Sequence, residues 1–302
     1  MRRSFVPLMT SVLLLLSAAW TGEATSAPAE KEMEVNGVRL PYVDQGSGKV
    51  VVLVHGAVSD LRVWEPVREI LARDHRVITY TQRYFGAASW RDEGKSFSIA
   101  AHADDLAKFV SSLNAGPVHL VGWSYGGSVA AVAAANNPRL VASLVLYEPP
   151  LDTALAPDSP GAKQAAAEAG QMFGPAVTAS KAGDQLGATL RLIEEVFQLP
   201  PGEAARQPEQ WQAMWRDNAR TMPPFLSAPP PTASCDTLKG VSSPTLVLVG
   251  AETKAFFPVI AERVRECIPG AERAVLSGVN HDAPVRDPAG FAAAVSRFVS
   301  KH

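Results

Sequence analysis

The sequence has little excess charge of either sign. Its 302 residues include 28 Lys and Arg and 30 Asp and Glu, which gives a formal net charge of −2. A protein without a basic surplus is poorly suited to neutralise a phosphate backbone, so we expect no nucleic-acid partner. The sequence also lacks a dinucleotide-type glycine pattern and an evident cluster of metal ligands. We therefore expect neither a cofactor nor a metal.

Long hydrophobic runs are also missing. The apolar stretch Val12–Trp20 is far shorter than the ~20 residues needed to span a bilayer. It follows Arg2 and Arg3 and precedes small residues between 24 and 29, which is the order of a secretory signal. We expect residues 1–27 to be a signal peptide, the mature chain to be periplasmic or secreted, and no stable membrane insertion. An N-terminal anchor helix is the alternative interpretation.

Cysteine is scarce, since the chain holds Cys235 and Cys267 alone. Export would place these residues in an oxidising compartment, where a disulfide between them could form and persist. The alternative is two separate buried thiols that pack as small apolar side chains. The sequence leaves both possibilities open.

Short apolar runs rich in β-branched residues recur along the chain and predict strands buried on both faces. These runs are Val50–Val54, Val77–Tyr80, Val118–Val121, Leu144–Tyr147 and Thr245–Val249, and the last predicted strand is Arg273–Leu276. Helix-like stretches alternate with them, namely Trp64–Ala72, Ile99–Leu113, Tyr125–Asn136, Phe256–Cys267 and a closing helix that begins at Asp287-Pro288. This alternation predicts an α/β fold with a mostly parallel central sheet and helices on both faces. Residues 33–44 instead predict a hairpin that turns at Asn36-Gly37.

One segment interrupts this alternation. No buried strand run appears from Leu151 to Thr237, and helical patterns occur at Leu186–Leu199 and Glu209–Arg220. We expect a helical cap that covers the strand ends, with a disordered linker as the alternative. The expected organisation is a first core part at 28–150, a cap at 151–237 and a second core part at 238–302.

The strongest chemical signal is Gly122-Trp123-Ser124-Tyr125-Gly126. It lies between a predicted strand and a predicted helix, where the turn is so sharp that the positions two before and two after Ser124 must lack bulk. Gly122 and Gly126 meet that demand. Such a turn holds a serine hydroxyl above the sheet at a helix N-terminus, which favours developing negative charge. We expect Ser124 to be a nucleophile.

A serine nucleophile needs a base and oxyanion donors. Among six histidines, His281 lies in a loop after the last predicted strand, where it can reach over the sheet edge to Ser124. His55-Gly56-Ala57 follows the first buried strand, and the glycine lets the backbone turn its N–H groups inward. The expected oxyanion donors are the N–H groups of Ala57 and Tyr125.

The order of these motifs resembles the α/β-hydrolase fold superfamily. The resemblance rests on His55-Gly56, on the serine turn that continues through Gly127, and on the late Gly278-x-x-His281, and it covers about residues 33–300. It implies Ser124 as nucleophile, His281 as base, a variable helical cap and esterase-like hydrolysis. The turn Gln82–Gly86 is similar to a family turn but lacks its usual aspartate, which is Thr81 here.

The third member of the catalytic set departs from the family pattern. Many members place an aspartate three residues after Gly250, where this chain has Thr253. Three carboxylates could replace it. Glu148, which follows a buried strand, is favoured because some haloalkane dehalogenases of the superfamily place their acid at that strand end. Glu252 is the next choice, and Asp282 is disfavoured because it adjoins His281 in sequence.

These residues predict a serine hydrolase that cleaves a small carboxylic ester through a Ser-His-Glu triad and an acyl-enzyme. Cofactor-free perhydrolases, C–C hydrolases and lactonases share the same constellation and remain alternatives. A non-catalytic binding protein that kept the fold is a third possibility. The expected partner is a small ester-like molecule.

Overall fold

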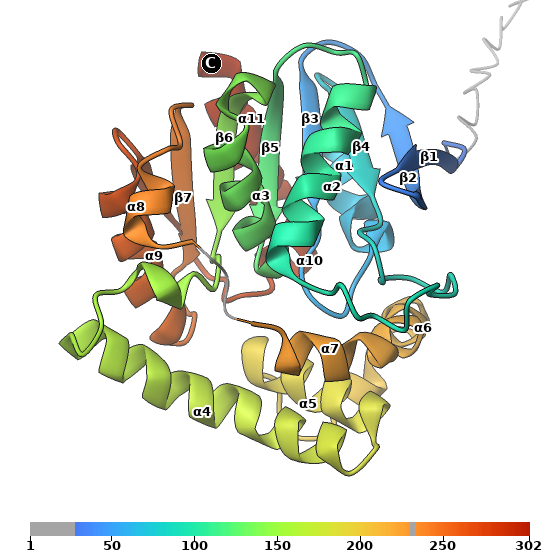
Figure 1. Cartoon of the computed structure of the whole chain (residues 1–302), viewed down its shortest axis with the longest axis vertical. Helices are drawn as coiled ribbons and strands as arrows, with labels where there is room; N and C mark the ends of the chain where they lie inside the picture. Colours follow the sequence, from blue (N-terminus) through green and yellow to red (C-terminus); the bar gives the residue numbers. More distant parts are fainter. Residues whose placement is uncertain (1–27, 230–232) are drawn as a thin grey trace, which may run out of the picture.

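An eight-stranded sheet forms the centre of the computed structural model, which describes residues 28–229 and 233–302 (Figure 1). The predicted signal peptide, residues 1–27, lies outside the described residues. The strand order is β1-β2-β4-β3-β5-β6-β7-β8. The strands are β1 Lys31–Val35, β2 Val38–Gln45, β3 Val50–Val54, β4 Arg76–Tyr80, β5 Val118–Trp123, β6 Val141–Tyr147, β7 Thr245–Gly250 and β8 Glu272–Leu276.

Strands β3 to β8 run parallel, and the hairpin β1–β2 joins the sheet antiparallel through β4. Asn36 and Gly37 both have positive φ, as a tight hairpin turn requires. Strands β5 and β7 are buried along their whole length because helices cover both faces of the sheet. The predicted mostly parallel α/β fold is therefore confirmed.

Helices pack on both faces of the sheet. Helices α2 (Ile99–Ser112) and α3 (Tyr125–Asn136) lie side by side in front of the strands in Figure 1, whereas α1 (Glu65–Leu71) packs against α11 (Pro288–Lys301) behind them. The N-terminal ten residues of α3 are all buried, since its Gly- and Ala-rich sequence lets the helix approach the sheet closely. The remaining core helices are α8 Cys235–Leu238, α9 Phe256–Cys267 and α10 Ala283–Arg286.

Helix caps agree with the sequence signals that mark them. The Ser98 hydroxyl accepts a hydrogen bond from the Ala101 N–H at the start of α2. The Asp287 carboxylate accepts one from Gly290, and Pro288 occupies the first turn of α11. Each cap satisfies a backbone donor that the helix itself leaves unpaired.

Four helices connect β6 to α8 and gather beyond one end of the sheet, at the bottom of Figure 1. They are α4 Pro160–Lys181, α5 Gln185–Val196, α6 Glu209–Asn218 and α7 Met222–Ser227. Their buried Met172, Met214 and Trp215 show that the described part of this segment packs as folded structure, which contradicts the linker alternative. The boundaries of the cap at 151 and 237 stay a prediction.

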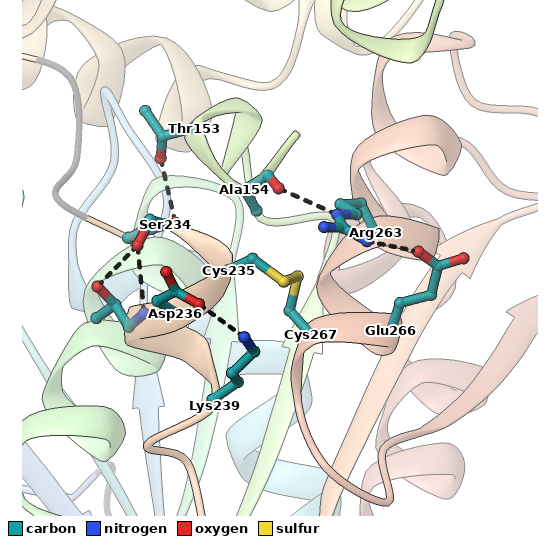
Figure 2. The surroundings of a disulfide bond; sticks show 11 residues. Thr153, Ala154, Ser234, Cys235, Asp236, Lys239, Arg263, Glu266 and Cys267 are labelled. Carbon is teal, nitrogen blue, oxygen red and sulfur yellow. Dashed lines mark hydrogen bonds and ion pairs between the residues drawn. A yellow bond between two sulfur atoms is a disulfide. The ribbon is translucent and has the colours of Figure 1, made fainter. Parts of the chain in front are cut away.

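A disulfide joins Cys235, the first residue of α8, to Cys267, the last residue of α9, with their Cα atoms 5.0 Å apart (Figure 2). The alternative of two separate thiols is therefore wrong. Nearby, the Thr153 hydroxyl donates to the Ala233 carbonyl, and Arg263 of α9 donates to the Ala154 carbonyl. The segment before the cap helices and the segment after them are thus both attached to one small region beside α9.

Candidate active site

Ser124 occupies the turn between β5 and α3 with a φ of 54°, a left-handed conformation that costs free energy in a non-glycine residue. A Cβ on Gly122 would lie 2.5 Å from the Gly126 carbonyl oxygen, and one on Gly126 would lie 2.3 Å from the Val54 carbonyl oxygen. These approaches exclude every other residue at both positions. The turn therefore has the steric character that its sequence predicts.

His281 lies in the loop between β8 and α10, and its side chain is buried. Its ring stacks on Phe257 with centroids 4.0 Å apart, and its carbonyl oxygen accepts a hydrogen bond of 2.9 Å from the Trp123 indole. The ring Nδ1 lies 2.6 Å from Glu148 Oε2. Because a carboxylate only accepts, Nδ1 carries the proton and Nε2 is left as the acceptor.

Glu148 directly follows β6, has a φ of 48° and is fully buried. Its Oε1 accepts from the Gly250 N–H at 2.8 Å, and its Oε2 accepts from the Thr253 hydroxyl at 3.1 Å as well as from His281. Three donors thus satisfy the buried carboxylate and fix its orientation. Thr253 stands where the sequence leads one to expect an acid, and its hydroxyl donates to the Glu148 carboxylate instead.

The other two candidate carboxylates lie elsewhere. The Glu252 side chain is exposed, and its backbone N–H donates to the Val279 carbonyl. Asp282 is buried and accepts a hydrogen bond from Arg286 Nε at 2.8 Å, while burial raises the pKa of its carboxyl. Within residues 28–229 and 233–302, the carboxylate hydrogen-bonded to the His281 ring is that of Glu148.

The loop that carries Ala57 is held by a buried histidine. His55 Nε2 accepts from the Gln82 N–H at 3.0 Å, so its Nδ1–H donates to the Gly56 carbonyl at 2.8 Å. Burial lowers the pKa of His55 to about 4, which keeps the ring neutral as this pattern requires. A Cβ on Gly56 would lie 3.3 Å from the Ser124 Cβ, so the loop passes directly beside the serine.

Tyr125 is anchored by a second buried histidine, a contact that the sequence did not reveal. Its hydroxyl donates to His102 Nδ1 at 2.6 Å, and His102 Nε2 donates to the Arg83 carbonyl at 3.1 Å. Burial lowers the pKa of His102 to about 3 and raises that of the Tyr125 phenol, so both groups stay neutral. The first residue of α3 is thereby fixed by its side chain.

A sequence profile described as alpha/beta hydrolase fold matches residues 49–288. The chain belongs to the alpha/beta hydrolase fold family.

Similar proteins include both characterised and uncharacterised members. An uncharacterised hydrolase of Bacillus subtilis, YraK, is 25% identical over 117 residues, which are 39% of this chain and 43% of that protein. The esterase RhEst1 from a Rhodococcus species is 24% identical with a TM-score of 0.72, covering 91% of this chain and 99% of that one. A thermophilic esterase from Thermogutta terrifontis is 27% identical with a TM-score of 0.61, covering 90% and 98% of the two chains.

Two adjoining cavities open at the serine turn of this hydrolase. The smaller, of about 40 Å³, is lined by Ser124 and His281 together with apolar side chains that include Phe173, Leu192 and Phe225. The larger, of about 340 Å³, lies between the cap and the loop after β3. Its lining shares Ala57, Trp123, Ile193 and Phe197 with the smaller cavity.

Two further findings concern metal binding and membrane-spanning helices. In the ranges that the structure covers, His, Cys, Asp and Glu side chains form no group of three or more arranged to hold a metal ion. In the same ranges, no helix combines the length and apolar character of a membrane span.

Proposed function

We propose that this hydrolase cleaves small carboxylic esters by acyl transfer through Ser124, with His281 as the base and Glu148 as the acid that orients it. One observation carries the proposal: the His281 ring donates its Nδ1 proton to a buried carboxylate and lines the same cavity as Ser124. A neutral imidazole in this tautomer presents Nε2 as the acceptor that a serine nucleophile requires.

In the first half-reaction, His281 Nε2 takes the Ser124 hydroxyl proton as the serine oxygen bonds to the ester carbonyl carbon. The carbonyl oxygen becomes an oxyanion and accepts hydrogen bonds from the N–H groups of Ala57 and Tyr125. The bond to the leaving oxygen then breaks, and that oxygen takes the proton from His281 Nε2. The alcohol departs and the acyl group stays on Ser124.

In the second half-reaction, water attacks the acyl-enzyme and gives its proton to His281. Collapse of the second tetrahedral intermediate releases the carboxylic acid, and His281 returns the proton to Ser124. Glu148 stabilises the imidazolium that forms in both halves but does not itself take the proton. The buried histidines His55 and His102 support the proposal because they hold the two backbone segments that would bind the oxyanion.

An ester panel of graded acyl chain length tests this function on the wild type and on Ser124→Ala. We expect hydrolysis by the wild type, strongest for short acyl groups because the cavity at Ser124 is small, and loss of that hydrolysis in Ser124→Ala. A fluorophosphonate probe should label the wild type at Ser124. Absence of both hydrolysis and labelling would favour the non-catalytic binding protein.

The other reactions predicted from the same residues are separated by their substrates. A lactone is an internal ester and follows the same two half-reactions, so lactone hydrolysis belongs in the panel. Perhydrolysis would appear as peracid formation when peroxide replaces water in the second half-reaction. A C–C hydrolase would cleave a diketone and spare simple esters.

We also propose that the protein is exported, with residues 1–27 removed as a signal peptide. The sequence order of that segment and the disulfide between Cys235 and Cys267 support export, because structural disulfides persist mainly in oxidising compartments. Fractionation of cells followed by N-terminal sequencing of the mature protein tests it. A cytosolic, uncleaved protein would contradict it.

A further inference from the structure

The larger cavity is lined by four polar or charged side chains that the proposed mechanism does not use, namely Ser59, Gln207, Asp282 and Arg286. Arg286 ends α10 and lines this cavity beside Asp282. Its Nε donates to Asp282 Oδ2 at 2.8 Å, and its side chain is 47% exposed, whereas that of Asp282 is 7% exposed. Within residues 28–229 and 233–302, the two terminal guanidinium nitrogens of Arg286 donate no hydrogen bond. Asp282 therefore orients a guanidinium whose outer edge is available to a ligand.

Apart from these polar side chains, the wall of this cavity is apolar and rich in aromatic rings. Trp211 and Trp215 lie one turn apart on α6, and Trp123 stacks on Phe197 with ring centroids 6.2 Å apart. Aromatic walls of this kind favour a planar aromatic ligand, because rings gain from offset or edge contacts beyond the area they bury. A volume of about 340 Å³ is enough for such a ring with a substituent.

The position of the cavity relative to His281 indicates which part of a substrate it would hold. Asp282, Val285 and Arg286 follow His281 along the chain and line the larger cavity, whereas His281 itself lines the smaller one. In the proposed mechanism the leaving oxygen takes its proton from His281, and the larger cavity is the one of these two with room for a bulky leaving group beside that point. The smaller apolar cavity at Ser124 is then left for the acyl group.

We infer that the larger cavity binds the leaving group of the ester, and that this group is an aromatic alcohol bearing a carboxylate that pairs with Arg286. The inference rests on the proposed ester hydrolysis and adds its substrate class: a short acyl chain on a carboxylated phenol. A guanidinium presents a planar fork of donors that matches a carboxylate with two parallel hydrogen bonds. Engagement of Nε by Asp282 leaves the outer pair of nitrogens for that contact.

The test compares 3-acetoxybenzoate with phenyl acetate in the wild type and in Arg286→Gln. For each substrate we take the ratio of kcat/KM in the wild type to that in the variant, because intrinsic ester reactivity cancels in this ratio. We expect the ratio for 3-acetoxybenzoate to exceed the ratio for phenyl acetate by about tenfold or more, mostly through KM. Arg286→Lys, which keeps the charge but loses the fork, should recover part of the difference.

Arg265→Gln is the matched control, because Arg265 also pairs with a carboxylate about one turn earlier in the chain but lies on α9 outside the cavity. It should leave both ratios near one. Equal ratios for the two substrates in Arg286→Gln would overturn the inference, since a purely structural role of Arg286 lowers both activities together.

A second measurement needs no variant. The product 3-hydroxybenzoate should inhibit phenyl acetate hydrolysis by the wild type at a concentration at least about tenfold lower than 3-hydroxybenzamide, which lacks the charge. Similar inhibition by both would also overturn the inference. If the wild type hydrolyses phenyl acetate through Ser124 and these preferences are absent, the leaving-group assignment alone fails. If no ester is hydrolysed, the proposed function is wrong, and so is the leaving-group assignment that rests on it.

Discussion

Replacement of Glu148 by glutamine tests the proposed catalytic set through hydrogen-bond geometry. Three donors converge on the two Glu148 oxygens, and a glutamine offers one oxygen and one NH₂ group. The Gly250 N–H belongs to the backbone and cannot turn away, so the amide oxygen must take the Oε1 position. The NH₂ group then faces His281 Nδ1.

An NH₂ donor at this place reverses the tautomer of His281. Nδ1 becomes the acceptor and the proton moves to Nε2, which can no longer take the Ser124 proton. The variant also loses the negative charge that stabilises the imidazolium. Together these losses should lower kcat by a factor on the order of 10² to 10⁴, equivalent to about 3 to 5 kcal/mol of transition-state stabilisation.

The assay is hydrolysis of a short-chain p-nitrophenyl ester, with the rate of fluorophosphonate labelling as a second readout. Glu252→Gln is the matched control, since its carboxylate is exposed and its kcat should stay within about twofold of the wild type. Circular dichroism and thermal unfolding check that both variants are folded. A large loss in Glu252→Gln with little change in Glu148→Gln would refute the reasoning and move the acid to the loop after β7.

Three other outcomes follow from the structure. Thr253→Val removes one donor to Glu148 and should lower kcat by about tenfold; a loss equal to that of Glu148→Gln, or none, would contradict a positioning role. Below pH 6.5, His55 and His102 bind protons in the unfolded chain but stay neutral in the folded protein. Burial lowers the pKa of His55 to about 4 and that of His102 to about 3 in the folded state. The free energy of unfolding, measured in urea, should therefore fall between pH 6.5 and pH 4 by about 1 kcal/mol per pH unit for each histidine; a flat profile would be inconsistent with neutral buried rings. Cys235→Ser removes the disulfide between positions 32 residues apart, so the free energy of unfolding, measured by thermal unfolding, should fall by about 3–4 kcal/mol. An unchanged melting temperature would show that the disulfide does not stabilise the protein.

The sequence predicted the core of the fold closely because local and tertiary preferences agree there. The bounds of β3, α3 and α9 coincide with the predicted ranges, and β3 ends where its β-branched run meets His55-Gly56. The cap was harder to predict. Its longest helix, α4, has Gly170, Gly174 and Pro175 within it, and these residues disfavour a helix unless packing compensates.

The candidate site was predictable in its parts but not in its contacts. Ser124 and His281 carry local signals, a glycine-flanked turn and a late loop histidine. The choice among three carboxylates depends on which side chain faces Nδ1, and that is decided by the packing of β5, β6 and β7 side by side. The support of Tyr125 by His102 joins residues 23 positions apart and has no sequence signature. The roles of these residues in catalysis stay predictions.

The attachment of the cap to the core bears on whether its helices can be exchanged for others. Thr153 and Ala154 precede the cap helices, Ala233 and Cys235 follow them, and these four residues are tied to each other or to α9. The two ends of the segment that carries the cap helices are thus held by bonds that do not involve those helices. A foreign set of helices placed between positions 156 and 229 would keep these anchor points, but it would lose the hydrogen bonds of Asn218 with Asp60 and Gly86 and the one that the Phe197 carbonyl accepts from Asn280, so a graft must supply these contacts again.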